Sequence, residues 1–372
     1  MMKPKICFVS MPIYPLLENS ESSRFCGGAE LQQLLIGSEL AARGYPISYV
    51  TLDHGQGPEC QLGPFRVLGA YRPGAGLPML KFYYPRWGGI MKALQRANAD
   101  VYYMRGAGFL LGPIVMYARR NGKRVVFAGA SDTDFDPKAR HFRFARDRFL
   151  YWWGLRRTDA VVTQNQHQAA CAKKLLGVKT QVIHNALPTH AKELSKQEDV
   201  LWVGNIRPKK MPERFVDLAA AFPEHSFVMV GGIADESRYP EGPSTTSGLP
   251  AHSLPNCKYT GYLAPAEVED RYARARVLVN TSDVEGFPNT FLHAWSWGVP
   301  VITYVDPDSI VEKNRLGWVV SSPDEMSTVL ARVLDGTLQA SPERIAAFFR
   351  AECMTEHQVD RYESVFAEFS GP

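Results

Sequence analysis

Short apolar strands alternate with helical patterns along nearly the whole chain of 372 residues. The first apolar run, KICFVSM, leads through a glycine-containing loop to AELQQLLIGSELAARGY, in which leucines recur at helical spacing. The later runs of the first half are PISYVTL, DVYYMRG, RVVFAGA, DAVVTQN and TQVIHNA. Continuous apolar strands separated by helices indicate a parallel sheet that helices cover on both faces. The alternation therefore predicts an α/β fold.

A polar passage without strand patterns, at residues 187–199, divides the chain. The alternation restarts after it with the runs VLWVGNI, SFVMVGG, CKYTGYL, RVLVNTS, PVITYV and GWVVSS. The chain is about twice as long as a typical domain. We therefore expect a linker at 187–199 between two doubly wound, Rossmann-like domains, with ligands beyond the carboxyl ends of their strands. Residues 234–256 are rich in glycine, proline and serine and predict a long surface loop.

Composition and charge exclude several classes of protein. The net charge of +4 is too small to indicate nucleic-acid binding. No apolar run approaches the roughly 20 residues that cross a bilayer. The apolar run near the N-terminus is short and contains Ser10 and Pro12, which favours a buried strand over a signal peptide. The six cysteines are scattered without a Cys-x-x-Cys pair, which favours reduced thiols in a cytoplasmic protein.

The segment EGFPNTFLHAWSWGVPVI, residues 285–302, combines an acidic loop with the start of a helix. Asn289 is a good N-cap for a helix from Thr290, and the free amides of Thr290, Phe291 and Leu292 would form an anion site. Glu285 would lie one turn away and accept hydrogen bonds from hydroxyls of the same ligand. The alternative is an ordinary loop acid before a buried helix.

A second strand-loop-helix junction, VGNIRPKKMPE at residues 203–213, places Arg207 and Lys210 just beyond a strand. Their side chains would face a further anionic oxygen at the carboxyl edge of the same domain. The alternative is a solvated basic loop. Both junctions occur in one domain, so together they predict a pyrophosphate site.

These motifs resemble those of the retaining GT-B glycosyltransferases of family four, the glycosyl transferases group 1. LWVGNIRPKK is similar to the family's Gly-Arg-x4-Lys segment, and the block at 285–302 to its Glu-x7-Glu motif. GGAE, DAVVTQN and VIHNALP occupy the usual places in the first half. The resemblance implies two Rossmann-like domains facing a cleft. Residues 1–190 would form the acceptor-side domain, to which a C-terminal helix at 355–372 crosses back, and residues 191–354 the nucleotide-sugar domain.

The resemblance also implies an activity. The enzyme would transfer a sugar from a nucleoside-diphosphate sugar to a glycan or lipid-linked acceptor with retention, without a metal or other cofactor. Such an enzyme would work in cell-surface polysaccharide or glycoconjugate synthesis. We expect it in the cytoplasm, and at the inner face of the cell membrane if its acceptor is lipid-linked.

The resemblance assigns roles to residues of this sequence by motif position. Lys210, helped by Arg207, would contact the donor pyrophosphate, and Glu285 would hold hydroxyls of the transferred sugar. The expected donor-binding residues are Gly27, Gly28, Gly204, Asn205, Tyr262, Leu263, Gly286, Phe287, Asn289, Thr290, Phe291 and His293. The expected acceptor-side residues are Arg105, Asp132 and Asp134.

The sequence departs from the family pattern at three places. Asn205 stands where the family has an arginine, and His293 where it has the second glutamate. Neutral imidazole offers one donor and one acceptor, so we expect His293 to make a single ribose contact; the alternative is that it packs near Trp297. The usual first-domain histidine is also missing, and Asp132 or Asp134 would substitute for it.

Other classes of function remain as alternatives. The SDTD stretch, with Asp132 and Asp134, matches the Asp-x-Asp mark by which another glycosyltransferase architecture binds Mn²⁺ or Mg²⁺. A nucleotide-sugar epimerase, or a protein that only binds nucleotide sugars, would share the fold. An NAD oxidoreductase is disfavoured because no Gly-x-Gly-x-x-Gly follows the first strand.

The stretch KARHFRFARDRFLYWWGLRR, residues 138–157, is basic and aromatic, with seven Lys or Arg, one acid and six aromatic residues. Its aromatic side chains near one helical face are Phe142, Phe149, Trp152 and Trp153. This pattern is typical of a helix that lies in an anionic membrane interface. The alternative is a helix that packs on its own sheet with solvated charges.

Overall fold

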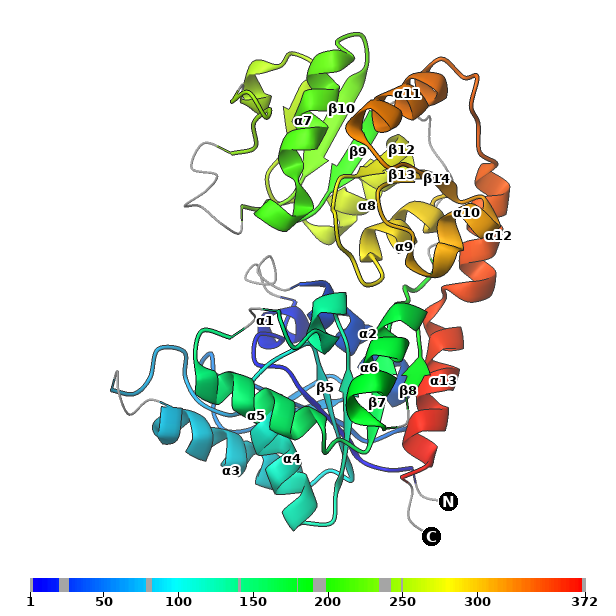
Figure 1. Cartoon of the computed structure of the whole chain (residues 1–372). Coiled ribbons are helices and arrows are strands. Elements are labelled where there is room, and N and C mark those ends of the chain that lie inside the picture. Colours follow the sequence, from blue (N-terminus) through cyan, green and yellow to red (C-terminus); the bar gives the residue numbers. More distant parts are fainter. Residues whose placement is uncertain are drawn as a thin grey trace. The chain divides into compact units, whose positions relative to one another are not determined.

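The structure is a computed structural model of the chain, and it describes residues 3–19, 27–77, 82–139, 142–178, 180–189, 199–233, 242–248 and 250–369. Parts of the predicted linker and loop, residues 190–198, 234–241 and 249, lie outside these described residues. The chain divides into two compact units (Figure 1). Unit 1 contains Met1–Ala186 and Thr355–Pro372, and unit 2 contains Leu187–Met354.

Unit 1 is built on an eight-stranded sheet with the order β3-β4-β2-β1-β5-β6-β7-β8. Its strands are β1 (Ile6–Val9), β2 (Ile47–Thr51), β3 (Cys60–Leu62), β4 (Phe65–Gly69), β5 (Val101–Arg105), β6 (Arg124–Ala128), β7 (Ala160–Thr163) and β8 (Thr180–Val182). All pairs are parallel except β3 with β4. Every residue of β1, β2 and β5 is buried, as expected for strands that helices cover on both faces.

The helices of unit 1 cover the two faces of this sheet. They are α1 (Tyr14–Leu17), α2 (Gly28–Ala42), η2 (Phe82–Trp87), α3 (Gly88–Ala97), α4 (Leu111–Arg120), η3 (Asp132–Phe135), α5 (Ala145–Leu155), α6 (Gln166–Leu176) and α13 (Thr355–Ala367). Side chains of β1 alternate between two cores: Ile6 and Phe8 pack in the core of α2 and α13, and Cys7 and Val9 in that of α3, α4 and α5.

Unit 2 contains a six-stranded sheet with the order β11-β10-β9-β12-β13-β14. Its strands, all parallel to their neighbours, are β9 (Asp199–Val203), β10 (Ser226–Val230), β11 (Cys257–Tyr259), β12 (Ala275–Asn280), β13 (Val301–Thr303) and β14 (Gly317–Val319). Its helices are η4 (Pro208–Lys210), α7 (Pro212–Ala221), η5 (Ala251–Ser253), α8 (Pro265–Arg274), α9 (Asn289–Ser296), η6 (Pro307–Ser309), α10 (Ile310–Asn314), α11 (Pro323–Leu334) and α12 (Pro342–Glu352). The predicted pair of doubly wound α/β sheets is therefore confirmed.

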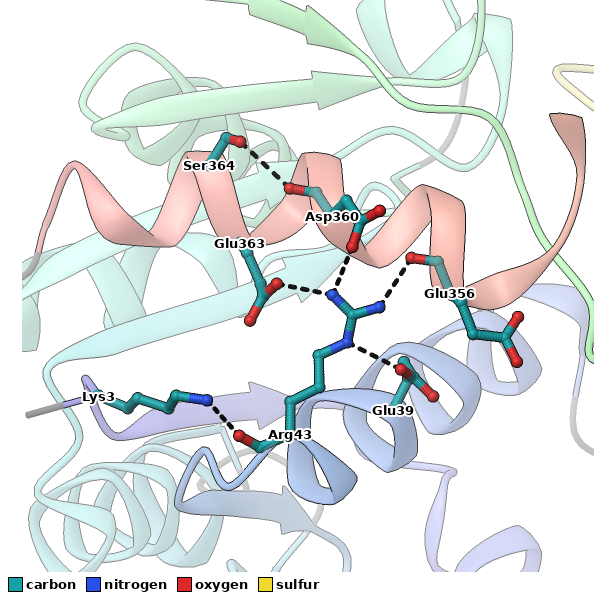
Figure 2. A network of polar contacts seen from close by, with 7 residues as sticks. All are labelled: Lys3, Glu39, Arg43, Glu356, Asp360, Glu363 and Ser364. Atoms are coloured by element: carbon teal, nitrogen blue, oxygen red, sulfur yellow. Dashed lines mark hydrogen bonds and ion pairs between the residues drawn. The ribbon is translucent and has the colours of Figure 1, made fainter.

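The C-terminal helix α13 is fastened to α2 by Arg43 (Figure 2). The Arg43 Nη1 lies 2.5 Å from Asp360 Oδ1 and 2.6 Å from Glu363 Oε2, and its Nε donates to Glu39 at 2.8 Å. The remaining Nη2 donates to the Glu356 carbonyl at 2.9 Å. Burial alone would lower the pKa of Arg43, but its carboxylate partners outweigh burial and raise that pKa. The helix that follows unit 2 in sequence thus belongs to unit 1.

Replacing Arg43 with alanine is expected to lower the free energy of unfolding of unit 1 by about 2 kcal/mol, because three carboxylates and a carbonyl lose a shared, mostly buried donor. The midpoint of urea unfolding measures this loss. Arg66→Ala is the matched control, since its ion pair with Glu59 is exposed and should contribute less than about 1 kcal/mol. Equal losses in the two variants would contradict a fastening role for Arg43.

Candidate active site

Three glycines of unit 2 bring backbone together at the carboxyl edge of its sheet. The amide of Gly204 donates to Val230 O at 2.9 Å, and that of Gly231 to Gly261 O at 2.9 Å. Gly231 has φ +150°, and a Cβ on it would lie 1.8 Å from the Gly204 carbonyl oxygen. Only glycine fits there. The expected donor-binding residue Gly204 therefore lies where two loops of backbone are in close contact.

Tyr262 and Leu263 follow Gly261 at this same edge. The Tyr262 side chain is 42% exposed, and its Cβ would lie 3.9 Å from a Cβ on Gly232. Leu263 is half-buried, as is Asn205, which follows Gly204. Four predicted donor residues thus share one edge of unit 2.

Lys210 and Glu285 form an ion pair between two loops at the carboxyl edge of unit 2. The Lys210 Nζ donates to Glu285 Oε1, and their side chains are only 18% and 13% exposed. A hydrogen-bonded chain holds the lysine loop, because Trp202 Nε1 donates to Thr281 Oγ1 at 2.9 Å and that hydroxyl donates to the Lys210 carbonyl at 2.7 Å. The structure therefore joins two residues that are 75 positions apart in sequence.

Two further predicted residues carry buried polar atoms that no described residue satisfies. They are Nε of Arg207 and Oγ1 of Thr290. A buried donor without a partner costs about 1–3 kcal/mol. Both atoms can donate a hydrogen bond, so an anionic oxygen suits both.

The start of α9 differs from the prediction at one residue. Pro288, with φ −66° and ψ 124°, is the N-cap, and Asn289 is the first helical residue. The extended Pro288 turns its carbonyl toward the helix, where it accepts the Phe291 amide at 3.1 Å. The Phe291 amide is therefore not free, which corrects the expectation of three free amides. Thr290 stays at the helix start, where the dipole favours an anion.

The residues between Glu285 and α9 are packed into the unit. Gly286 is buried, and the side chains of Phe287 and Phe291 are 3% and 0% exposed. Both rings contact Trp295, with centroids 6.4 and 5.5 Å away. Only their backbone is suited to ligand contact, and their rings fix the loop that carries Glu285.

His293 is held by residues of α8 and by its own helix. Its Nδ1 lies 2.6 Å from Glu269 Oε1, and the other carboxylate oxygen accepts Trp297 Nε1 at 2.6 Å. The ring stacks on the buried Tyr272, with centroids 5.3 Å apart and planes at 11°. Glu269 fixes the tautomer, because a proton on Nδ1 leaves Nε2 as the acceptor of the neutral ring. The imidazole is 23% exposed.

Two residues near the site have no motif that predicts them. Arg214 Nη1 lies 2.5 Å from Asp283 Oδ1 and 3.2 Å from Thr281 O, and Arg214 is in the first turn of α7. Glu269 has no sequence signal, because it reaches His293 from a separate helix.

The predicted residues of unit 1 lie at several places. Gly27 is the N-cap of α2, and its amide donates to Glu30 Oε2 at 2.8 Å; Gly28 is the first helical residue. Arg105 ends β5 and is only 8% exposed. Its Nη2 donates to Oδ1 of the neutral Asn185, and its Nη1 lies 3.5 Å from the hydroxyls of Tyr103 and Tyr362.

Asp132 and Asp134 bind different groups, which separates two residues that the sequence left as equivalent. Asp134 is 4% exposed, and its Oδ2 accepts the amides of Ala130 at 2.8 Å and Ser131 at 3.2 Å. Asp134 thus holds its own loop. Asp132 is half-buried and lines a pocket. Among the described residues, no group of three or more His, Cys, Asp and Glu could hold a metal ion.

Comparisons with known proteins give family matches over both units. A profile of Glycosyl transferases group 1 matches residues 197–336, and one of Glycosyltransferase Family 4 matches residues 26–191. No curated protein matches the sequence.

Several solved structures are similar over nearly the whole chain. Sucrose-phosphate synthase from Thermosynechococcus elongatus has 18% identity and a TM-score of 0.79, covering 98% of this chain and 99% of its own. HepE from Anabaena, in complex with UDP and glucose, has 15% identity and a TM-score of 0.73, covering 98% and 100%. WaaG, a glycosyltransferase involved in lipopolysaccharide biosynthesis, has 16% identity and a TM-score of 0.69, covering 97% and 99%. The expected GT-B fold is confirmed.

Proposed function

Because the chain belongs to the group 1 glycosyltransferases and is a glycosyltransferase enzyme, we propose that it transfers a sugar from a nucleoside-diphosphate sugar to a glycan or lipid-linked acceptor. The transfer proceeds with retention of anomeric configuration. The product belongs to the synthesis of cell-surface polysaccharide or glycoconjugate.

The observation that carries this proposal is the largely buried pair of Lys210 and Glu285 at the carboxyl edge of unit 2. An ammonium has three donors, so Nζ can hold Glu285 and a diphosphate oxygen together. As the glycosidic bond breaks, negative charge grows on the leaving diphosphate, and a fixed cation stabilises it more than it stabilises the ground state. Glu285 accepts hydrogen bonds from hydroxyls of the sugar that moves.

Arg207 and Thr290 complete the diphosphate site. Their buried Nε and Oγ1 have no partner among the described residues, and phosphate oxygens accept from both. The N-terminus of α9 adds the positive end of its dipole. With Lys210, these groups supply the charge that a metal ion supplies elsewhere, so no metal or other cofactor enters the proposed reaction.

The identity of the donor and acceptor draws support from the similar structures. HepE is solved with UDP and glucose and with UDP-glucose, which supports a nucleoside-diphosphate sugar as donor. WaaG is involved in lipopolysaccharide biosynthesis, which supports a glycoconjugate as acceptor. Gly204, Asn205, Tyr262 and Leu263 form the edge against which the nucleoside would lie.

Incubation with a panel of nucleoside-diphosphate sugars and glycan acceptors, read by product mass, tests the proposal. Transfer gives an acceptor heavier by one sugar and a free nucleoside diphosphate. A nucleotide sugar of unchanged mass but altered stereochemistry would identify an epimerase instead. Tight binding without turnover of any donor would identify a binding protein.

His293→Ala is expected to raise the donor KM several-fold and leave kcat nearly unchanged, because one ribose contact that is equal in ground and transition states is lost. Steady-state kinetics with varied donor measure this. Glu269→Gln keeps the shape of the pair and should give a smaller rise in KM, since the imidazole loses its charged partner. An unchanged KM in His293→Ala would show that this side chain only packs against Tyr272.

We propose that the enzyme works in the cytoplasm, at an anionic membrane surface. The residues that contact the membrane differ from the aromatic face that the sequence predicts for residues 138–157. Trp152 and Trp153 of α5, and Phe142 before it, are half-buried against the core of unit 1, and α5 lies beside α4 (Figure 1). The packing alternative therefore holds for those three aromatic residues. Phe149 stays 65% exposed. None of the helices in the described part of the chain is long and apolar enough to span a bilayer.

The exposed aromatic residues of unit 1 come from two neighbouring segments. Tyr83, Tyr84, Phe144 and Phe149 are each more than half exposed, and we call them the aromatic patch. The segments meet where the Arg146 guanidinium lies 3.4 Å from the ring centroid of Phe82. Aromatic side chains beside arginines suit a membrane interface with anionic lipids.

The variant with all four residues of the aromatic patch changed to serine is expected to lose most of its sedimentation with phosphatidylglycerol vesicles at low salt, because apolar burial adds to charge attraction in such binding. Vesicles of phosphatidylcholine alone and the wild-type protein at high salt are the controls. A wild-type protein that does not bind phosphatidylglycerol vesicles at any ionic strength would remove the membrane proposal.

A further inference from the structure

A pocket of about 380 Å³ lies entirely within unit 1, between η3 and α6. The segment η3 follows β6, and α6 follows β7, so the η3 end of the pocket is at the carboxyl edge of two neighbouring parallel strands, and its lining continues along α6 to Leu175. Ligands of open α/β sheets bind at this edge, and the volume is within the usual range of small-molecule sites.

Asp132 is the most firmly positioned polar side chain of the pocket. Its Oδ1 accepts hydrogen bonds from Asn165 Nδ2 and from Gln168 Nε2, both at 2.9 Å. The two amide residues are only 2% and 0% exposed. They are themselves fixed, since Gln168 N donates to Asn165 Oδ1 at 2.7 Å and Gln164 N to Gln168 Oε1 at 2.9 Å. Buried amides thus hold the carboxylate in one orientation.

Both amide donors bind the same oxygen of Asp132. Its Oδ2 is bound by no described residue. A carboxylate accepts about four hydrogen bonds, so Oδ2 keeps its capacity for a donor in the pocket. A ligand that supplies hydroxyl donors satisfies it.

The rest of the lining is mixed. His167, Cys171 and Lys174 lie along one face of α6, at spacings of four and three residues, and the His167 Nε2 is 3.7 Å from the Cys171 Sγ. Phe135 and Leu175 supply apolar wall. The combination of a fixed acceptor, polar side chains and apolar wall suits a small ring that carries hydroxyls on its edge and C–H groups on its face.

We propose that this pocket binds an uncharged sugar ring of the acceptor, with hydroxyls donating to Asp132 Oδ2 and the C–H face against Phe135 and Leu175. The proposal rests on the proposed function and adds the chemical class of the acceptor group. An anionic group does not suit the Asp132 end of the pocket, because two carboxylates, Asp132 and Asp136, line that side.

Binding of the methyl glycosides of glucose, galactose, mannose and N-acetylglucosamine, followed by ligand-observed NMR, tests the pocket directly. At least one glycoside should bind the wild-type protein. Asp132→Asn keeps the oxygen that the amides bind and replaces Oδ2 with a donor, so affinity should fall about tenfold. Leu175→Trp fills the pocket and should abolish binding. Asp147→Asn, which removes an ion pair with Arg146 outside the pocket, should leave affinity unchanged.

Three results would overturn the proposal: no glycoside binds, binding is unchanged in both pocket variants, or the matching sugar phosphates bind and the uncharged glycosides do not. UDP affinity and melting temperature, measured on each variant, show whether the fold and unit 2 are intact. Transfer activity that is the same in both pocket variants as in the wild-type protein would contradict this inference and would not contradict the proposed function. Glycoside binding at the pocket without transfer from any donor would contradict the proposed function alone.

Discussion

Lys210→Ala is expected to lower kcat/KM by about 100- to 1,000-fold, in keeping with the loss of a positioned donor to transition-state charge. The Nζ is largely buried, so water replaces it poorly, and the loss also leaves Glu285 as a buried carboxylate without its cation. Donor turnover with saturating acceptor measures the effect. Activity of the wild-type enzyme in EDTA should be unchanged.

Lys209→Ala is the matched control, because Lys209 is the exposed neighbour in the same loop. Its activity should stay within about twofold of wild type, as for a screened surface charge. Full loss of wild-type activity in EDTA, with rescue by Mn²⁺, would contradict the metal-independent site and return attention to Asp132 and Asp134.

Glu285→Ala is expected to lower kcat about 100-fold and to change the donor KM little, because its partners are hydroxyls of the sugar that moves. Glu285→Gln keeps one acceptor and the size of the side chain, and it should recover part of the rate. Glu312→Ala serves as the control, since this glutamate is exposed on α10.

A double-mutant cycle separates the joint role of Lys210 and Glu285 from two independent roles. The side chains are in contact, so their effects on kcat/KM should be far from additive. Additive effects would show that the ion pair has no part in the reaction. A raised donor KM with unchanged kcat in Glu285→Ala would place that carboxylate on the nucleotide rather than on the sugar.

Much of the fold was predictable from local pattern. Continuous apolar runs such as ICFV and ISYVT became fully buried parallel strands, because covering helices require apolar side chains on both faces of a strand. Lys210 and Glu285 were predictable as members of one site, because the carboxyl ends of parallel strands meet at the same edge of a sheet.

Where the predictions failed, a competing tertiary contact decided the outcome. Trp152 and Trp153 belong to an aromatic, basic helix for which the sequence left a membrane face and packing on its own sheet both open, and contacts with the core of unit 1 half-bury both side chains. At the start of α9 the Phe291 amide donates a hydrogen bond to the Pro288 carbonyl, whereas the sequence predicted that this amide is free. Periodicity reports which residues are apolar, but not which neighbour buries them.

The sequence by itself determined the α/β class, the order of the elements and the types of residue expected at the donor site. The first two follow from the period of apolar side chains, and the third follows from motif position. Only the tertiary structure decided what each polar group binds. It separated Asp132, held by Asn165 and Gln168 at a pocket, from Asp134, which holds its own loop. It also set Glu269 beside His293. Hydrogen bonds act over about 3 Å in space, and no spacing along a chain records which distant residues folding brings that close.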